Sequence, residues 1–402
     1  MNDERGGAPV KSTRRRWDGV LYGASGFVGR QTVAYFAQHA QGLRWALAGR
    51  SADKLEAVRA ACGPGAAAAG IVVADAADLP ALEALAAQTA VVLSTAGPFA
   101  LYGSALVQAC VEQRTHYVDI TGETPWVRGL IERHHAQAAR QGTRIVPCCG
   151  YDSVPSDLGA WLVAQAMWRR HGEPCVEIKA CHTARGGLNG GTLASALNLM
   201  DDGQAAALAD PFLLNPPGTA PADAAAHADP VLPRHDDDFD AWVGPFFMGP
   251  VNTRVVRRSV ALLAARGEPA YGTGFAYQEV MRFGEGPLAA AAAAGVTLGM
   301  GVGQAALRLR PWRAALRALA PSPGAGPSER SMDHGSFRCD LLGRSASGKV
   351  VRGRIADRGD PGNRATTRFV CEAALALALQ LDALPGGVSA GGVLTPASAF
   401  GD

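Results

Sequence analysis

The sequence predicts an α/β protein with a Rossmann-type, doubly wound parallel sheet and a second α/β (α+β) domain. Three observations lead to this prediction. Apolar runs of strand length alternate with segments of helical spacing between residues 17 and 157, regularly spaced glycines follow the first run, and the chain has 402 residues. Alternating strands and helices favour a parallel sheet. Because a single core stops growing at about 250 to 300 residues, we expect two domains.

The first element is a strand, a tight turn and a helix. The apolar run Val20–Tyr22 leads into Gly23-x-x-Gly26-x-x-Gly29, and the amphipathic segment Gln31–His39 follows. In such a motif the first glycine permits the sharp turn, the second lets the backbone lie against a pyrophosphate, and the third lets the helix pack closely on the sheet. The free amides of a helix start also attract phosphates. The motif therefore predicts dinucleotide binding by the three glycines and by Ser25, Phe27 and Val28.

The second strand indicates which dinucleotide is bound. Leu43–Arg50 is the expected strand, and an NAD-binding fold usually has an acidic residue at its end to accept from the ribose 2′-hydroxyl. Here Arg50 and Ser51 occupy that place, with Lys54 one turn later. A guanidinium suits a 2′-phosphate, whereas a carboxylate would repel it. These residues predict NADP(H) in preference to NAD(H).

Further strands and helices complete the predicted sheet. The strands are Ile71–Asp75, Ala90–Ser94, Tyr117–Ile120 and Thr143–Pro147, and the helices are Ala52–Cys62, Leu79–Gln88, Ser104–Gln113 and Pro125–Gln141. Asp75 either faces the adenine or caps the next helix. Ligands bind beyond the carboxyl ends of parallel strands, so the loop 95–103 is expected over the cofactor through Thr95, Ala96, Gly97 and Pro98. A stiff connector shaped by Gly97 and Pro98 is the alternative.

Several motifs in the same order make the chain similar to a known family. They include Tyr22-Gly-Ala-Ser-Gly-Phe-Val-Gly29, Thr95-Ala-Gly-Pro-Phe99, His116-Tyr-Val-Asp-Ile-Thr-Gly-Glu123 and Cys149-Gly-Tyr-Asp-Ser-Val-Pro-Ser-Asp157, and they continue to Gly391-Gly-Val-Leu-Thr-Pro396. The chain resembles the saccharopine dehydrogenase-like oxidoreductases over nearly its whole length. Within them it most resembles the branch that contains bacterial trans-acting enoyl reductases.

The resemblance implies an NADP-binding domain, a second domain that covers the cofactor, and a chain end that returns to the first domain. We therefore expect a mobile tail at 1–16, the NADP-binding domain at 17–157, a substrate or oligomerisation domain at 158–365 and a returning segment at 366–402. The resemblance also implies a reductase and, from its mycobacterial branch, a role in lipid metabolism. The run Phe99–Tyr102 replaces the histidine expected after the proline, and no basic set for an amino-acid carboxylate is evident.

The expected reaction is hydride transfer from NADPH to a C=C or C=O group of a lipid-like or acyl substrate. It needs a proton donor and stabilisation of developing negative charge. Tyr102, Tyr151 and Asp152 are the candidates because they lie at predicted strand ends, although Asp152 could simply cap a loop. Two alternatives are a non-catalytic or partner-dependent NADPH-binding protein that docks on a lipid surface or a synthase, and an imine reductase acting on amino acids.

Other polar residues near these strand ends have structural interpretations. Asp119 and Glu123 could steer a substrate amine, but carboxylates favour helix starts, so we expect them to fix the turn and cap the next helix. Cys149 has no histidine placed to activate it. His134 and His135 lie on a predicted helix with no evident role.

The second domain is less regular. We expect a helix at Leu158–Trp168, strands at Cys175–His182 and Phe275–Arg282, and a glycine-rich turn at 186–191 before a helix at 192–200. Residues 210–240 are rich in Pro, Ala and Asp, which predicts a long surface excursion that is either a lid or disordered. Within it, His235-Asp-Asp-Asp238 is interpreted as a solvated acidic loop, and no metal site is predicted.

Residues 286–307 contain no charge and are long enough to cross a bilayer. They are mostly Ala and Gly, whereas spanning helices depend on Leu, Ile, Phe and Val, so a buried or dimeric helix is favoured. Gly295, Gly299 and Gly303 share one face and permit close helix packing. Because arginines and Trp312 follow, peripheral contact with anionic lipid is the alternative.

Composition narrows the partners. The net charge of +2 gives no reason to expect nucleic acid as a partner. Eight cysteines without metal-type spacing indicate reduced thiols in a cytoplasmic protein. The basic start, with no apolar run before the first strand, does not predict a signal peptide.

Overall fold

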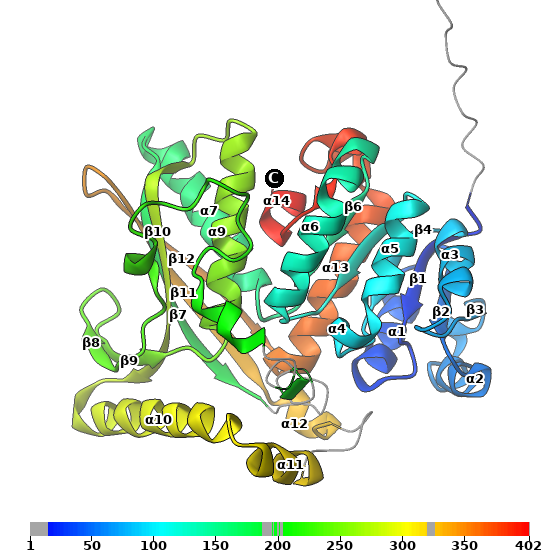
Figure 1. Ribbon diagram of the computed structural model, residues 1–402, viewed down its shortest axis with the longest axis horizontal. Helices are drawn as coiled ribbons and strands as arrows, with labels where there is room; N and C mark the ends of the chain where they lie inside the picture. Colours follow the sequence, from blue (N-terminus) through cyan, green and yellow to red (C-terminus); the bar gives the residue numbers. More distant parts are fainter. Residues whose placement is uncertain are drawn as a thin grey trace, which may run out of the picture.

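The computed structural model describes residues 15–186, 195, 197, 198, 201, 204–319 and 326–401. Two sheets lie side by side with helices between and around them (Figure 1). The glycine-rich turn and the helix predicted at 186–200 fall almost entirely outside the described residues, as does the tail at 1–14. Arg15 is described, and its guanidinium donates to the carbonyl oxygens of Gln113 and Arg114 at 2.8 and 2.9 Å.

Sheet A is a parallel, doubly wound sheet, which confirms the predicted fold class. Its seven strands run in the order β13-β6-β5-β4-β1-β2-β3. They are β1 (Trp17–Tyr22), β2 (Trp45–Gly49), β3 (Gly70–Val73), β4 (Thr89–Ser94), β5 (His116–Asp119), β6 (Arg144–Val146) and β13 (Gly392–Val393). The direction of winding reverses between β1 and β4, where ligands bind in folds of this kind.

The helices of sheet A cover both faces. They are α1 (Phe27–His39), α2 (Ala52–Ala61), α3 (Leu79–Ala87), α4 (Phe99–Tyr102), α5 (Ser104–Glu112), α6 (Thr124–Gln141), α13 (Thr366–Leu379) and α14 (Pro396–Phe400), with short helical turns at Pro64–Ala66, Pro361–Ala365, Leu381–Ala383 and Gly387–Ser389. The predicted loop 95–103 contains α4, because buried Phe99 turns the chain inward there.

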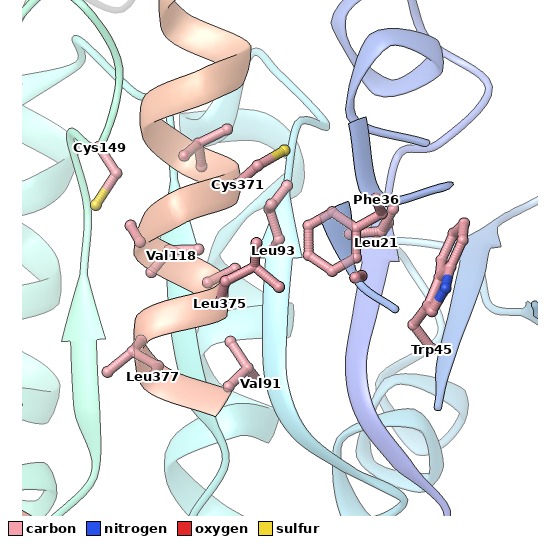
Figure 2. Close-up of a cluster of buried hydrophobic side chains, with 14 of the residues drawn as sticks. Leu21, Phe36, Trp45, Val91, Leu93, Val118, Cys149, Cys371, Leu375 and Leu377 are labelled. Atoms are coloured by element: carbon pink, nitrogen blue, oxygen red, sulfur yellow. The ribbon is translucent and has the colours of Figure 1, made fainter. Parts of the chain in front are cut away.

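The chain end supplies part of the core of sheet A. Figure 2 shows α13 lying across β1, β4 and β5, with Cys371, Leu375 and Leu377 beside Leu93 and Val118. Burying a side chain of leucine size stabilises a fold by roughly 1.5 to 3 kcal/mol. This helix therefore contributes to the first domain although it follows the second in sequence.

Sheet B is mixed and has the order β12-β11-β7-β10-β9-β8. Its strands are β7 (Cys175–Arg185), β8 (Arg234–Asp236), β9 (Ala241–Pro245), β10 (Tyr271–Gly284), β11 (Ser336–Ser345) and β12 (Val350–Arg358). Helices α7 (Val154–His171) and α9 (Gly249–Ala265) lie between this sheet and the first domain (Figure 1). The other elements are α10 (Gly286–Leu307), α11 (Arg310–Leu319), α12 (Glu329–Asp333) and short helical turns at Gln204–Ala209 and Ala224–His227.

The segment 210–240 is not simply a surface excursion. Phe212 and Leu214 are buried, and two buried arginines of α9 bind the carbonyl groups around them. Arg257 donates to Pro211 O at 2.8 Å and to His227 O at 2.7 Å, and Arg258 donates to Leu214 O at 2.6 Å. Charged donors satisfy buried carbonyls that no strand partner reaches. Sequence periodicity could not show this, because the partners come from a helix further along the chain.

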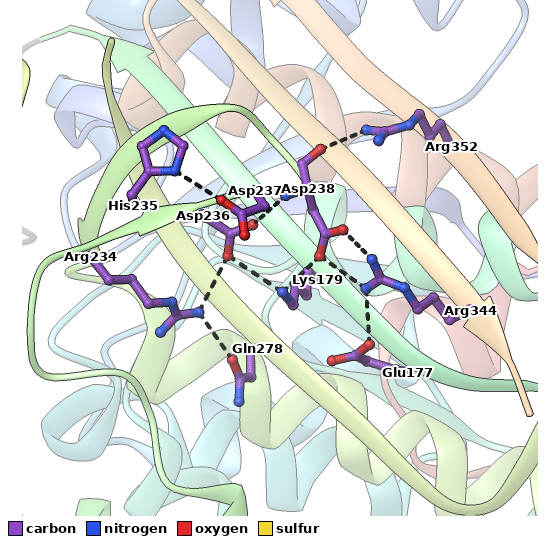
Figure 3. A network of polar contacts seen from close by, with 10 residues as sticks. All are labelled: Glu177, Lys179, Arg234, His235, Asp236, Asp237, Asp238, Gln278, Arg344 and Arg352. Atoms are coloured by element: carbon purple, nitrogen blue, oxygen red, sulfur yellow. Dashed lines mark hydrogen bonds and ion pairs between the residues drawn. The ribbon is translucent and has the colours of Figure 1, made fainter. Parts of the chain in front are cut away.

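The acidic run is also not a solvated loop, and this interpretation was wrong for two of its residues. Asp236 is buried in β8, and Asp238 accepts from Lys179 Nζ at 2.7 Å and from the Arg344 guanidinium (Figure 3). These hydrogen bonds, chiefly the one from Arg344, lower the pKa of Asp238 to about 2. Only Asp237 points fully into solvent. The carboxylates thus join β8 and its following turn to β7 and β11.

Candidate functional site

The glycine loop between β1 and α1 has the geometry of a phosphate-binding turn. Gly23 has a φ of +82°, and its amide donates to Ala48 O at 2.9 Å. A Cβ atom on Gly29 would lie 2.1 Å from Gly23 O, and one on Gly26 would lie 3.2 Å from the same atom. Side chains at these positions would therefore push α1 away from the turn. Glycine suits these positions because the backbone of α1 packs directly against the backbone of the turn.

The start of α1 faces the same turn without a side-chain cap. Its N-cap residue is Gly26, which makes no capping hydrogen bond, and the first turn contains no acidic residue. The first amides of a helix have no partner within the helix and carry partial positive charge. The helix start is therefore suited to phosphate oxygens.

Arg50 lies at the expected place. It directly follows β2 and is exposed, and its guanidinium forms no ion pair with any carboxylate that the structure describes. Ser51 is the N-cap of α2, yet its side chain makes no capping hydrogen bond. Lys54 is exposed in the first turn of α2. A cation and an uncommitted hydroxyl thus stand at the end of β2, which suits the recognition of a phosphate.

Asp75 does not cap a helix, so that interpretation was wrong. The N-cap of α3 is Asp78, which accepts from Ala81 N at 3.1 Å, whereas Asp75 accepts from Ala77 N at 2.9 Å. Burial, and next the charge of Asp75, raise the pKa of Tyr22 to about 12, while Arg50 opposes the shift. Asp75 and Arg50 thus act on one tyrosine at the same end of the sheet. That Asp75 contacts the adenine stays a prediction.

The loop after β4 packs directly on the glycine loop. A Cβ atom on Gly23 would lie 2.9 Å from Ala96 N and 3.1 Å from Thr95 Oγ1. The Gly97–Pro98 peptide is cis. Both Gly97 and the half-buried Pro98 stand at the carboxyl end of the sheet, beside the switch point between β1 and β4. The four predicted residues 95–98 are therefore next to the predicted phosphate site.

Glu123 holds this loop from the neighbouring strand. Its buried carboxylate accepts from the amides of Phe99 and Ala100 at 2.8 and 2.9 Å, and from Ser195 Oγ at 2.7 Å. We expected Glu123 to cap the next helix, α6; it is the N-cap residue of α6, but its side chain makes no capping hydrogen bond there. It caps α4 instead, because parallel strands bring the loops after β4 and β5 together.

Asp119 and Cys149 are fully buried at the carboxyl ends of β5 and β6 and have structural hydrogen-bond partners. Asp119 is buried and accepts from Thr121 N and Cys148 N at 3.0 and 3.1 Å, which fixes the turn as expected. Burial raises its pKa to about 7. The Cys149 thiol donates to Val146 O at 3.3 Å, and burial raises its pKa well above the ordinary value. The neutral thiol is therefore favoured, and a neutral thiol is a poor nucleophile.

The three candidate proton donors have different surroundings. Tyr102 is 47% exposed on α4, and Asp152 is half-buried with its pKa raised by burial to about 6. Tyr151, which follows β6, is 3% exposed, and its hydroxyl has no hydrogen-bond partner among the described residues. Burial raises the pKa of Tyr151 well above its ordinary value.

Tyr151 belongs to an apolar cluster where the two domains meet, which we call the Tyr151 cluster. Its buried members are Tyr151, Phe246, Phe337 and Ala365, with Met248, Met281, Ile355 and Phe369 packed against them. A Cβ atom on Gly122, after β5, would lie 3.5 Å from Met248 Cε. The cluster therefore covers the carboxyl ends of β5 and β6.

Two buried polar residues beside this cluster were missed in the sequence. His182 on β7 stacks on Phe246 at 4.2 Å, and its Nε2 lies 3.6 Å from Glu279 Oε1 on β10. Burial alone would lower the pKa of His182, but Cys339 and Glu279 raise it to about 10. Both residues occupy inward positions of alternating strands. The sequence did contain a signal for them, because His182 and Glu279 are titratable residues at positions of the strand pattern that otherwise hold apolar residues.

The glycine loop, the uncapped helix start and Arg50 fit an NADP(H) molecule. The evidence for the fit is the close approach of Gly29 to Gly23 O, which leaves no space for a side chain, together with the tight contact that a Cβ atom on Gly26 would make with the same oxygen. Within the described residues, no three His, Cys, Asp or Glu side chains gather as a metal site. The fold and this site define a class, the NADP(H)-dependent oxidoreductases with a Rossmann domain.

Comparisons with known proteins narrow the class. Residues 20–146 match the saccharopine dehydrogenase NADP binding domain. A Mycobacterium tuberculosis protein with the provisional name trans-acting enoyl reductase is 39% identical to this chain, and the aligned region covers 98% of this chain and 95% of the relative. The Mycobacterium ulcerans trans-acting enoyl reductase is 38% identical, with coverage of 98% and 96%.

A solved structure of saccharopine dehydrogenase (L-Glu forming) from Saccharomyces cerevisiae has a TM-score of 0.48, is 13% identical, and covers 94% of this chain and 93% of its own. The mycobacterial relatives show that the chain belongs to the saccharopine dehydrogenase-like oxidoreductases, in the group of the trans-acting enoyl reductases. It is an NADP(H)-dependent reductase, as the sequence predicted.

Proposed function

We propose that this reductase saturates an activated C=C bond of an acyl chain that a separate synthase presents. The mycobacterial relatives are named trans-acting enoyl reductases, and that name supports a substrate made on another protein. The observation that carries the proposal is the Tyr151 cluster. It combines buried apolar side chains with one buried hydroxyl that lacks a partner among the described residues.

The composition of the cluster suits an acyl chain. Phe246 and Phe337 are buried, Met248 packs against them, and all three side chains are apolar at the carboxyl ends of β5 and β6. Ligand sites are typically apolar with a few convergent polar groups. An amino-acid substrate would need cations for its carboxylate, and the cluster offers none among its members. The imine reductase alternative therefore has no support from this site.

Tyr151 can serve as the hydrogen-bond donor to the substrate. When bound, NADPH supplies the hydride for the double bond. Reduction of a bond conjugated to a thioester shifts negative charge onto the carbonyl oxygen, which a positioned donor stabilises. Because burial raises the pKa of Tyr151, its hydroxyl keeps its proton at neutral pH. The α-carbon must then take a proton, and Asp152, with a pKa of about 6, is the nearest candidate to relay that proton from solvent. Tyr102 stays a prediction, with an exposed side chain.

The test compares Tyr151→Phe with Tyr271→Phe. Tyr271 is a matched control because its hydroxyl is also buried without a partner among the described residues, but it lies at the start of β10 and packs on Phe275 at 4.8 Å. Loss of one oxyanion donor costs about 100- to 1,000-fold in kcat. We expect that loss in NADPH consumption with a 2-enoyl thioester for Tyr151→Phe only, with unchanged NADPH affinity.

Two results would contradict the proposal at different points. Equal turnover of Tyr151→Phe and the wild type would remove Tyr151 from the reaction. No NADPH consumption by the wild type with any 2-enoyl thioester, either free or on the carrier domain of a synthase, would exclude the enoyl substrate itself.

A further inference from the structure

Helix α10 exposes an almost entirely apolar face to solvent. Only Ala289 and Ala293 are buried in its 22 residues. Leu288, Leu298 and Val302 are 87%, 70% and 61% exposed. Apart from Gln304, every exposed residue of α10 is Gly, Pro, Ala, Val or Leu. A surface helix normally turns its polar side chains to water, whereas this helix is apolar on its buried side and on its exposed side. Of the two favoured alternatives, burial in the core was wrong, whereas the dimeric helix stays a prediction.

The residues that follow α10 are basic and aromatic. From Gly286 to Leu319 the sequence contains four arginines and no acidic residue. Arg308 and Arg310 are exposed, Leu309 between them is 61% exposed, and Trp312 is 50% exposed. Figure 1 shows α10 along the lower edge of the molecule and α11 continuing from its end. Exposed apolar residues with Arg and Trp beside them are typical of helices that lie in a lipid interface.

We propose that the α10–α11 surface, which is the outward face of residues 286–307 together with residues 308–312, docks this protein on an anionic lipid surface. The apolar residues enter the boundary between headgroups and acyl chains, and Arg308 and Arg310 contact the headgroup phosphates. This proposal does not depend on the enoyl substrate.

The helix lies on the membrane rather than across it. Its length and composition would allow a span. However, Ala289 and Ala293 pack inward, and a Cβ atom on Gly244 of β9 would lie 3.1 Å from Thr297 Oγ1. One side of the helix is therefore attached to sheet B over more than two turns. A helix held in this way can present its opposite side to a lipid surface.

A second copy of the chain fits this surface less well. A helix of 22 residues is about 33 Å long, so an outward strip about 10 Å wide has an area of roughly 330 Å², against about 800 Å² on each partner of a stable interface. Much of the strip is also alanine and glycine. The absence of acidic residues from 286 to 319 gives a partner's arginines no counter-charge within the strip.

The test is cosedimentation of the full-length protein with vesicles of phosphatidylcholine, with and without phosphatidylglycerol. We expect binding to the anionic vesicles at low salt, with a loss at high salt because salt screens exposed charges. The variant Leu298→Glu/Val302→Glu should bind at least about 10-fold more weakly, since charged groups avoid the hydrocarbon region. Arg308→Gln/Arg310→Gln should lose the preference for anionic vesicles.

Val231→Glu/Leu232→Glu is the matched control, because these two residues are 71% and 72% exposed outside the proposed surface. It should bind like the wild type, and all variants should keep their melting temperature and NADPH affinity. Failure of the wild type to sediment with anionic vesicles at low salt would overturn the proposal, as would an equal loss in the control. A wild-type dimer that Leu298→Glu/Val302→Glu dissociates, without vesicle binding, would assign the surface to a second copy instead.

Discussion

Replacing Gly29 by alanine should separate α1 from the phosphate-binding turn. The new Cβ atom would lie 2.1 Å from Gly23 O and 2.9 Å from the Cα and carbonyl carbon of Ala24. Non-bonded carbon atoms settle at roughly 3.5 to 4.0 Å, so the start of the helix must move by about 1 Å or more. Overpacking of this kind costs about 1 to 3 kcal/mol. The displaced amides would also miss the pyrophosphate.

The assay is a titration of wild type and Gly29→Ala with NADPH and with NADH, together with a thermal melt. Because the pyrophosphate is common to both dinucleotides, we expect both affinities to fall by a similar factor. Gly249→Ala is the control, since Gly249 also lies in the first turn of a helix but a Cβ atom there meets nothing within 4 Å. If Gly29→Ala bound NADPH with wild-type affinity, the glycine loop would not be the phosphate site.

Two further predictions concern single charges. Arg50→Gln should weaken NADPH binding by about 2- to 5-fold at low salt, because an exposed ion pair contributes at most about 1 kcal/mol, and should leave NADH affinity unchanged; equal losses for both would exclude contact with the 2′-phosphate. Burial raises the pKa of Asp157 to about 7, against the hydrogen bonds from Ser259 Oγ and Ala397 N. The folded state therefore favours the neutral carboxyl. The stabilisation by Asp157 is fully present below the unfolded pKa of about 3.9 and is lost as the pH rises through about 7. In chemical denaturation, the free energy of unfolding of Asp157→Asn should fall less steeply with pH over that range than that of the wild type. If both fell equally, groups other than Asp157 would cause the pH dependence.

The site shows where local pattern is sufficient and where it is not. Gly23, Gly26 and Gly29 were predicted to form the turn because their reason is local: the backbone of the turn meets the backbone of the helix. The place of Arg50 at the end of β2 followed from the same unit. The Glu123 carboxylate was assigned to the wrong helix, because only the pairing of β4 with β5 brings it to the amides of Phe99 and Ala100.

The second domain depended more on long-range contacts. The alternating strands around His182 and Glu279 were recognised, but their ion pair joins β7 to β10, which are far apart in sequence. The acidic residues Asp236 and Asp238 were predicted to be solvated because nothing near them in sequence indicates Lys179 and Arg344. Charge runs can be interpreted only when their partners are known.

By itself, the sequence determined the strand and helix order of the first domain, the glycine turn after β1 and the cofactor class, because each depends on residues close together in the chain. The tertiary structure decided which buried charges meet, that α13 completes the core of sheet A, and that α10 turns an apolar face outward. Those outcomes depend on contacts between residues distant in sequence, and periodicity reports which residues share a face but not what that face meets.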